Sequence, residues 1–247
     1  MKAPYILFII WFAWLPLTTG AADTGIAKKI IDSSLAVMPP LFASVLADHR
    51  RDIVDGFRDT ERSLQYRIPA QGASGERVRV FIDRLARELT ESIGKRPNFR
   101  RIAYTYGQIA AAFYRMYDPC AYLPADSPAL ALLQREYSKL QLAQLRKFKF
   151  FFYGYYCREQ HLSIERRRQM AKLLQAAFLH NGKVRSHRYF SYRSIPFGLA
   201  QIHLNSAFSM TVCTWFSIWE QAKGYTQDSP YYQRKPAQPG RFLAIVE

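Results

Sequence analysis

The segment Phe99–Tyr117 constrains the fold most strongly, because apolar residues fall on most sides of the helix that it predicts. A helix on the surface of a globular protein carries one apolar stripe, whereas a helix that is apolar nearly all round has to be covered on several sides. The segment therefore predicts a buried central helix with other helices packed around it.

Helical periodicity extends along the rest of the chain. Between residues 78 and 93 the apolar positions recur three or four residues apart, at Val78, Phe81, Ile82, Leu85, Leu89 and Ile93. Further helices are expected at residues 26–38, 41–57, 128–152, 163–180 and 197–223, with breaks at Pro39-Pro40 and stops at Gly154 and Asn181-Gly182. Because no alternating strand pattern stands out, we predict an all-α bundle of about seven helices over residues 23–224 and an irregular tail over residues 225–247.

The first 22 residues are typical of a secretory signal peptide. Lys2 is followed by an apolar core over residues 5–17 and by the small residues Thr18-Thr19-Gly20-Ala21-Ala22. The alternative is an uncleaved membrane anchor, although the apolar core is short for a membrane span. The pattern predicts a secreted or periplasmic protein with no transmembrane helix in its mature chain.

The chain is strongly basic, with 35 Lys and Arg against 19 Asp and Glu and a formal net charge of +16. Such a field favours phosphate-rich polyanions or anionic lipid surfaces as partners. Cations and aromatic residues are mixed over residues 185–193, where Arg185, Arg188 and Arg193 are the predicted anion-binding residues. The competing interpretation is a solvated basic surface without a specific partner.

Three cysteines, Cys120, Cys157 and Cys213, lie far apart in the sequence, and no C-x-x-C motif occurs. A thiolate zinc site is therefore not expected. Two of the three can pair in an oxidising compartment, or the cysteines can remain buried free thiols, and the sequence does not choose among these possibilities.

Four segments occur in an order that matches a known superfamily. They are the Pro39-Pro40-Leu41 break with residues 49–56, the segment Gly56-Phe57-Arg58-Asp59-Thr60-Glu61-Arg62, residues 104–119, and residues 194–224 with their Trp215-Phe216-Ser217-Ile218-Trp219 run. Together they resemble the zinc-dependent phospholipase C and S1/P1 nuclease superfamily. The resemblance implies a helical bundle whose zinc cluster hydrolyses phosphodiesters.

Carried over residue by residue, the resemblance implies a depleted metal site. Asp59 and Asp118 match ligand positions, and His203 lies in the last helix, where the family can place a ligand. Tyr66 and Tyr114 stand where the family has histidines, and the N-terminal Trp of the family is missing. His203 is either a remaining ligand or a hydrogen-bonded helix histidine.

These replacements predict a degenerate site. Asp59 and Asp118 are expected to approach each other, with Tyr66 and Tyr114 donating hydrogen bonds to them. One carboxylate is expected to be either protonated or paired with an arginine such as Arg62 or Arg115. We therefore expect an exported, non-catalytic or weakly active relative without tightly bound zinc. The alternatives are an active metal-dependent phosphodiesterase acting on phospholipid or nucleic acid, with zinc as its cofactor, and a basic protein that binds nucleic acid or envelope polyanions.

Overall fold

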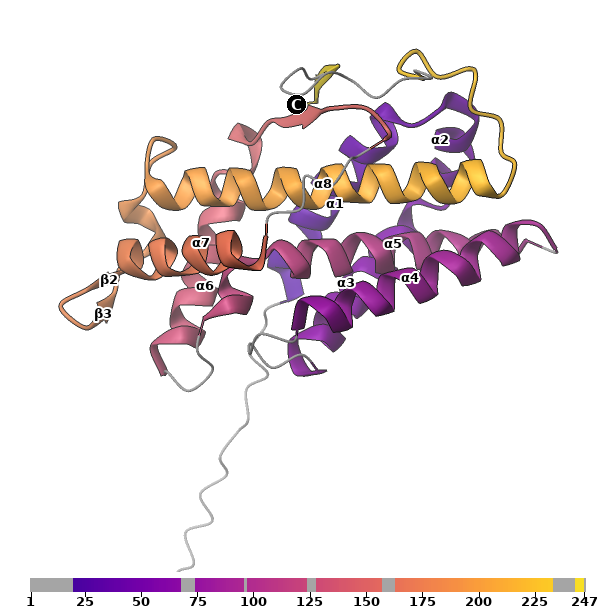
Figure 1. Ribbon diagram of the computed structural model, residues 1–247. Coiled ribbons are helices and arrows are strands. Elements are labelled where there is room, and N and C mark those ends of the chain that lie inside the picture. The colour runs from indigo at the N-terminus through magenta and orange to yellow at the C-terminus, as the bar shows by residue number, and fades with distance from the viewer. Residues whose placement is uncertain are drawn as a thin grey trace, which may run out of the picture.

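The computed structural model describes residues 20–67, 74–95, 97–123, 128–156, 163–232 and 243–246. Eight α-helices make up most of these residues, and the strands form two short antiparallel pairs (Figure 1). The helices are α1 (Gly20–Val37), α2 (Pro40–Ala47), α3 (Arg50–Arg67), α4 (Ser74–Ile93), α5 (Phe99–Tyr117), α6 (Pro128–Ala143), α7 (Ile164–Phe178) and α8 (Ile195–Gln221). The predicted all-α bundle is confirmed.

Helix α5 occupies the centre of the bundle, as its apolar composition predicts. Most of its residues are buried, and α3, α4 and α8 all pack against it. Figure 1 shows α8 running alongside α5 across the molecule. Trp215 of α8 is fully buried and donates its indole N–H to the carbonyl oxygen of Tyr106 at 3.2 Å. Trp215 thus fills space in the core and also donates a hydrogen bond to a carbonyl oxygen of the central helix.

Two glycines allow α3 and α5 to pack with their backbones in contact. A Cβ atom at Gly107 would lie 1.9 Å from the carbonyl oxygen of Ile53. A Cβ atom at Gly56 would lie 2.0 Å from the carbonyl oxygen of Tyr104. No side chain fits at either distance, so this helix pair requires glycine at both positions.

Two of the predicted helices are wrong in extent. The helix expected over residues 41–57 is divided into α2 and α3, and α3 continues to Arg67. The helix expected to reach residue 152 ends at Ala143, and Phe150–Phe152 forms strand β1. Phe148, Phe150 and Phe152 are buried at every second position, which is the periodicity of a strand rather than of a helix.

The end of the chain supplies the partner of β1. Strand β4 (Ala244–Val246) pairs with it antiparallel, with Phe150 opposite Val246. The expectation of an irregular tail is therefore wrong for these last residues. A second hairpin joins β2 (Leu179–His180) to β3 (Lys183–Val184).

The Asn181-Gly182 pair is a hairpin turn and not the helix stop that we expected. Helix α7 ends at Phe178, and the φ angles of Asn181 and Gly182 are 49° and 72°. Positive φ at both central residues matches a two-residue turn whose twist suits the flanking strands.

Three further observations bear on the predictions about export. Helix α1 begins at Gly20, so a signal-peptide boundary after Ala22 falls within its first turn, while residues 1–19 lie outside the described part. In the described ranges, no helix is long and apolar enough to cross a membrane. Cys213 is disulfide-bonded and Cys120 is a free, buried thiol, whereas Cys157 falls outside the described residues.

Candidate functional site

Asp118 lies directly after α5, and both of its carboxylate oxygens accept hydrogen bonds from residues of the fold. One carboxylate oxygen accepts the backbone N–H of Cys120 at 2.9 Å and caps the 3₁₀ helix Pro119–Tyr122. The other accepts from Nη1 of Arg115 at 2.9 Å, and both side chains of this ion pair are nearly buried. The predicted pairing of Asp118 with an arginine is therefore confirmed.

His203 lies in α8 with no exposed surface, and both of its ring nitrogens have partners. Nε2 is 2.8 Å from the carbonyl oxygen of Tyr114, which can only accept, so we assign the proton to Nε2. Nδ1 then accepts from the side-chain amide of Gln141 at 3.0 Å, with the Tyr137 hydroxyl at 3.3 Å. Burial lowers the pKa of His203, and the charge of nearby Asp118 opposes this effect. The neutral ring is thus a structural element that joins α5, α6 and α8.

Tyr114 completes this network through the side-chain amide of Gln141. Its hydroxyl donates to Oε1 of Gln141 at 2.9 Å, and its ring stacks on that of His203 with centroids 4.6 Å apart. The structure therefore brings Tyr114 and His203 together. We expected the Tyr114 hydroxyl to donate a hydrogen bond to an aspartate. This expectation is wrong, because the hydroxyl donates to the amide oxygen of Gln141 instead.

Asp59 belongs to a different part of the surface. Its side chain is 48% exposed, accepts from the Tyr104 hydroxyl at 3.3 Å and lies 3.9 Å from Nε of Arg58. It shares no hydrogen-bond or ion-pair partner with Asp118 in the described part of the chain, so the expected meeting of the two carboxylates is not seen. The side chain of Tyr66 lies outside the described residues.

The residues present do not fit the zinc cluster that the resemblance implies. A zinc ligand needs a free lone pair, and the acceptor nitrogen of His203 already receives hydrogen bonds from Gln141 and Tyr137. The carboxylate of Asp118 is neutralised by Arg115. Among the described residues, no group of three or more His, Cys, Asp or Glu side chains is arranged to hold a metal ion.

The three predicted anion-binding arginines belong to one loop, residues 185–193, which we call the basic-aromatic loop. Arg188 and Arg193 are exposed and Arg185 is half-buried. Tyr189 is 79% exposed and Tyr192 is 48% exposed. The guanidinium of Arg193 lies 5.3 Å from the ring centroid of Tyr192. The ammonium of Lys147, which comes from a separate 3₁₀ turn, lies 4.9 Å from the same centroid.

The charge around this loop has a further source in the sequence that the motif search missed. From Arg166 to Trp219 the chain contains no Asp or Glu, while Lys and Arg occur repeatedly. The loop follows the β2–β3 hairpin, which projects from one end of the bundle (Figure 1). A long segment without acidic residues therefore gives the cations of this end no acidic neighbours within the same segment.

One carboxylate fixes the position of the basic-aromatic loop. Glu136 of α6 is 7% exposed and accepts from the backbone N–H of His187 at 2.9 Å and from its ring Nδ1 at 2.8 Å. It also accepts from Nζ of Lys139 at 2.8 Å. Burial alone would raise the pKa of Glu136, but the hydrogen bonds from Lys139 and His187 outweigh it and lower the pKa to about 2. Phe190 adds an apolar anchor, with its ring 4.5 Å from that of Phe178.

Replacing Glu136 with glutamine is expected to lower the free energy of unfolding at pH 7 by about 1–3 kcal/mol, the typical value of hydrogen bonds to a charged group. The folded-state pKa lies below the ordinary value, so the carboxylate stabilises the fold above about pH 4.5, and this contribution is lost as the pH falls toward about 2. Thermal unfolding of both proteins between pH 7 and pH 2 should therefore show the difference shrinking with acid.

The matched control for that variant is Glu91→Gln. Glu91 is 72% exposed and lies 3.9 Å from Lys95, so its replacement should change stability by less than about 0.5 kcal/mol at any pH. An equal loss in both variants, or a Glu136→Gln difference that does not depend on pH, would show that this carboxylate does not anchor the loop.

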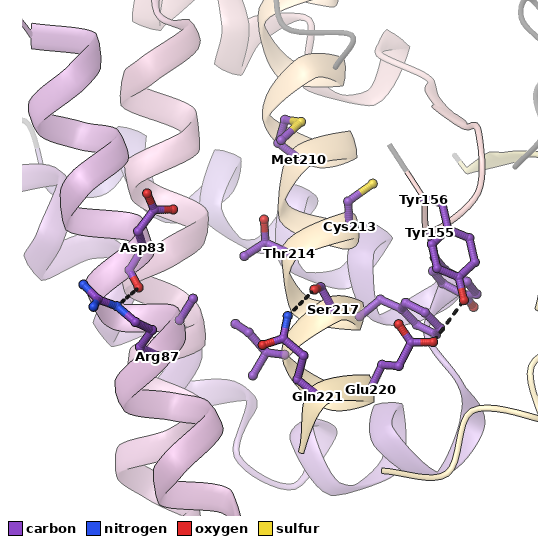
Figure 2. A pocket seen from close by; sticks show the side chains of 13 residues that line it. Asp83, Arg87, Tyr155, Tyr156, Met210, Cys213, Thr214, Ser217, Glu220 and Gln221 are labelled. Atoms are coloured by element: carbon purple, nitrogen blue, oxygen red, sulfur yellow. Dashed lines mark hydrogen bonds between the residues drawn. The ribbon is translucent and has the colours of Figure 1, made fainter. Parts of the chain in front are cut away.

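A groove between α4 and α8 is a second surface feature, and no sequence pattern predicted it. It has a volume of about 580 Å³, and Figure 2 shows Asp83 and Arg87 on one side facing Thr214, Ser217 and Gln221 on the other. Its polar groups largely bond to one another. Gln221 donates to Ser217 at 2.9 Å, and the Tyr156 hydroxyl donates to Glu220 at 3.0 Å. Because these groups are satisfied internally, the groove indicates no particular ligand.

Comparison with protein-family models, with characterised proteins and with solved structures found no match to this chain.

Proposed function

We propose that this protein binds phosphate-rich polyanions through its basic-aromatic loop and does not act as a metallohydrolase. The observation that carries the proposal is the surface of that loop, where exposed Arg188 and Arg193 flank exposed Tyr189 and Tyr192. Cations attract the phosphates of a polymer, and exposed aromatic rings offer faces on which bases stack. The anchors at Glu136 and Phe178 hold the loop in place before a ligand arrives, which reduces the entropy lost on binding.

We further propose that the scaffold derives from the zinc-dependent phospholipase C and S1/P1 nuclease type, with a site that no longer holds zinc. The resemblance along the sequence, the helical bundle and the closeness of Tyr114 to His203 support this proposal. In this view an amide, Gln141, and a cation, Arg115, have taken over the hydrogen bonds and the charge that a metal ion would otherwise supply.

Export to the periplasm or the exterior is part of the same proposal. The apolar core near the N-terminus supports it, and so does the disulfide at Cys213, since disulfides persist mainly in oxidising compartments.

The proposed function is tested by replacing Arg185, Arg188 and Arg193 together with alanine and measuring the binding of single-stranded DNA at several salt concentrations. We expect at least a tenfold loss of affinity near 100 mM salt. The slope of log K against log salt should become shallower by about 2, since each phosphate contact on a single strand contributes about 0.7. Fluorescence anisotropy with a labelled oligonucleotide gives both quantities.

The control removes three cations from another region. Arg51, Arg84 and Lys95 have side chains that are 95%, 60% and 78% exposed, and each lies about 4 Å from a carboxylate. Their triple alanine variant has the same net charge as the loop variant. If both variants lose affinity equally, binding reflects overall charge and the loop is not a site. If the loop variant loses binding only to anionic vesicles, the partner is a membrane surface and not a nucleic acid.

A further inference from the structure

Two isoleucines in the first half of α8 are exposed to solvent next to the basic-aromatic loop. Ile195 is 61% exposed and Ile202 is 44% exposed, and we call them the isoleucine pair. They are seven residues apart in one helix, so their side chains lie on the same face about two turns apart. Gly198 lies between them, and among the described residues no atom comes within 4 Å of its Cβ position. The pair therefore forms an apolar stripe that is open to solvent.

The segment that follows α6 lies against the same part of α8. Gln201 accepts the backbone N–H of Lys149 at 3.2 Å and donates to the carbonyl oxygen of the same residue at 2.6 Å. The Phe148 ring stacks on that of Phe197, with the two centroids 4.7 Å apart. Gln201 and Phe197 both lie between the two isoleucines in the sequence, so this segment runs beside the isoleucine pair.

Exposed cations of two distant segments therefore gather around the start of α8. Arg146 and Lys147 are exposed and precede the segment that is fixed against the helix. The ammonium of Lys147 lies 4.9 Å from the ring centroid of Tyr192, and the guanidinium of Arg193 lies 5.3 Å from the same centroid. This half-exposed tyrosine joins the cations of both segments just before α8 begins.

The combination of aliphatic and cationic side chains distinguishes among partners. Binding a single strand of nucleic acid uses cations and aromatic rings, and it leaves two exposed isoleucines without a role. A second copy of the chain would bring the same cations face to face across a symmetric contact, which is electrostatically unfavourable. An anionic bilayer suits both kinds of side chain. Its phosphates attract the cations, and the boundary between headgroups and acyl chains accepts isoleucine and tyrosine.

We propose that the isoleucine pair and the cations around it form a face that docks onto an anionic lipid membrane. The isoleucines enter the boundary between headgroups and acyl chains, while Arg146, Lys147 and Arg193 remain at the level of the phosphates. This inference goes beyond the proposed function. The two surfaces share Arg193, but the isoleucines take no part in the binding proposed for the basic-aromatic loop, so either proposal can fail without the other.

The test measures the partitioning of the full chain onto vesicles of phosphatidylcholine and phosphatidylglycerol in equal amounts, by cosedimentation. The isoleucine variant, Ile195→Ser with Ile202→Ser, should lower the partition coefficient about tenfold or more, because two apolar side chains no longer enter the membrane. Its affinity for single-stranded DNA should be unchanged. Vesicles of phosphatidylcholine alone should bind the wild type more weakly, since they carry no net charge for the cations to neutralise.

The matched control replaces two apolar side chains of similar exposure elsewhere. Leu41 in α2 is 49% exposed and Val80 in α4 is 58% exposed. The double variant Leu41→Ser with Val80→Ser should bind the vesicles as the wild type does. A third variant, Ile195→Trp, reports insertion directly, and its fluorescence should be quenched by brominated lipid more strongly than that of the wild type.

Several results would overturn this proposal. They are a wild-type protein that does not bind the anionic vesicles, equal binding to neutral vesicles, an equal loss in the control variant, and no added quenching in Ile195→Trp. Undiminished vesicle binding by the isoleucine variant, or a loss of its DNA affinity as large as that of its vesicle binding, would do the same. Loss of vesicle binding in the isoleucine variant, with unchanged DNA affinity in the variant of the three loop arginines, would support this proposal and contradict the proposed function.

Discussion

Replacing Gly107 with alanine is expected to destabilise the protein by about 3 kcal/mol or more. The added Cβ would lie 1.9 Å from the carbonyl oxygen of Ile53 and 2.8 Å from the backbone nitrogen of Phe57. Both atoms belong to the backbone of α3, so no side chain can rotate away and the two helices have to separate. Overpacking of a core usually costs about 1–3 kcal/mol, and rigid backbone contacts bring the cost to the upper end or beyond.

The control for this prediction is the same substitution at Gly198. This residue is exposed in α8, and no atom lies within 4 Å of its Cβ position. Alanine has the higher helix propensity, so Gly198→Ala should stabilise the protein by up to about 1 kcal/mol. Chemical denaturation followed by circular dichroism measures both variants. A Gly107→Ala protein as stable as the wild type would mean that α3 and α5 do not pack at this distance.

The second large effect is expected from replacing Gln141 with leucine, which should cost about 2–4 kcal/mol. Gln141 is fully buried, accepts from Tyr114 and donates to His203. Leucine has a similar size but no polar atoms, so it leaves the Tyr114 hydroxyl without its partner and removes a donor from the imidazole. Buried polar groups that lose their partners incur the full cost of desolvation, and a connected network raises that cost.

Gln169→Leu provides the comparison for Gln141→Leu, because Gln169 is exposed on α7 and its replacement should change stability by less than about 0.5 kcal/mol. The same measurements test the metal hypothesis. Zinc should not raise the Tm of the wild type, and a chelator should not lower it. Stoichiometric zinc that survives dialysis, together with a small effect of Gln141→Leu, would show that these side chains ligate a metal and do not form the network described above.

The helical class and the central position of α5 were predictable from local pattern. Apolar residues on most sides of one segment and single stripes on its neighbours determine which helix is inside, whatever the detailed packing. The location of the cations was also predictable in part, since Arg185, Arg188 and Arg193 fall in one loop beyond the last residues of α7. The half-burial of Arg185 depends on packing against other segments, which cannot be read from the sequence.

The boundaries that we predicted wrongly depend on contacts distant in sequence. Phe150–Phe152 is a strand because Ala244–Val246 pairs with it, almost a hundred residues later. The Asn181-Gly182 pair suits either a helix stop or a hairpin turn, and it becomes a turn because Lys183 can pair with His180. In both segments the local residues allow a helix as well as a strand or turn, and pairing with another strand selects the second conformation.

The identities of the residues at the positions of interest can be read from the chain, whereas their roles depend on the contacts that the fold creates. A tyrosine at position 114 and an aspartate at position 118 are visible in the chain, but their partners come from other helices or from the turn that follows α5. His203 was a possible ligand until Gln141 and the Tyr114 carbonyl occupied both of its nitrogens. Charge and periodicity are properties of the chain, whereas desolvation and the choice of a hydrogen-bond partner arise only when distant segments meet.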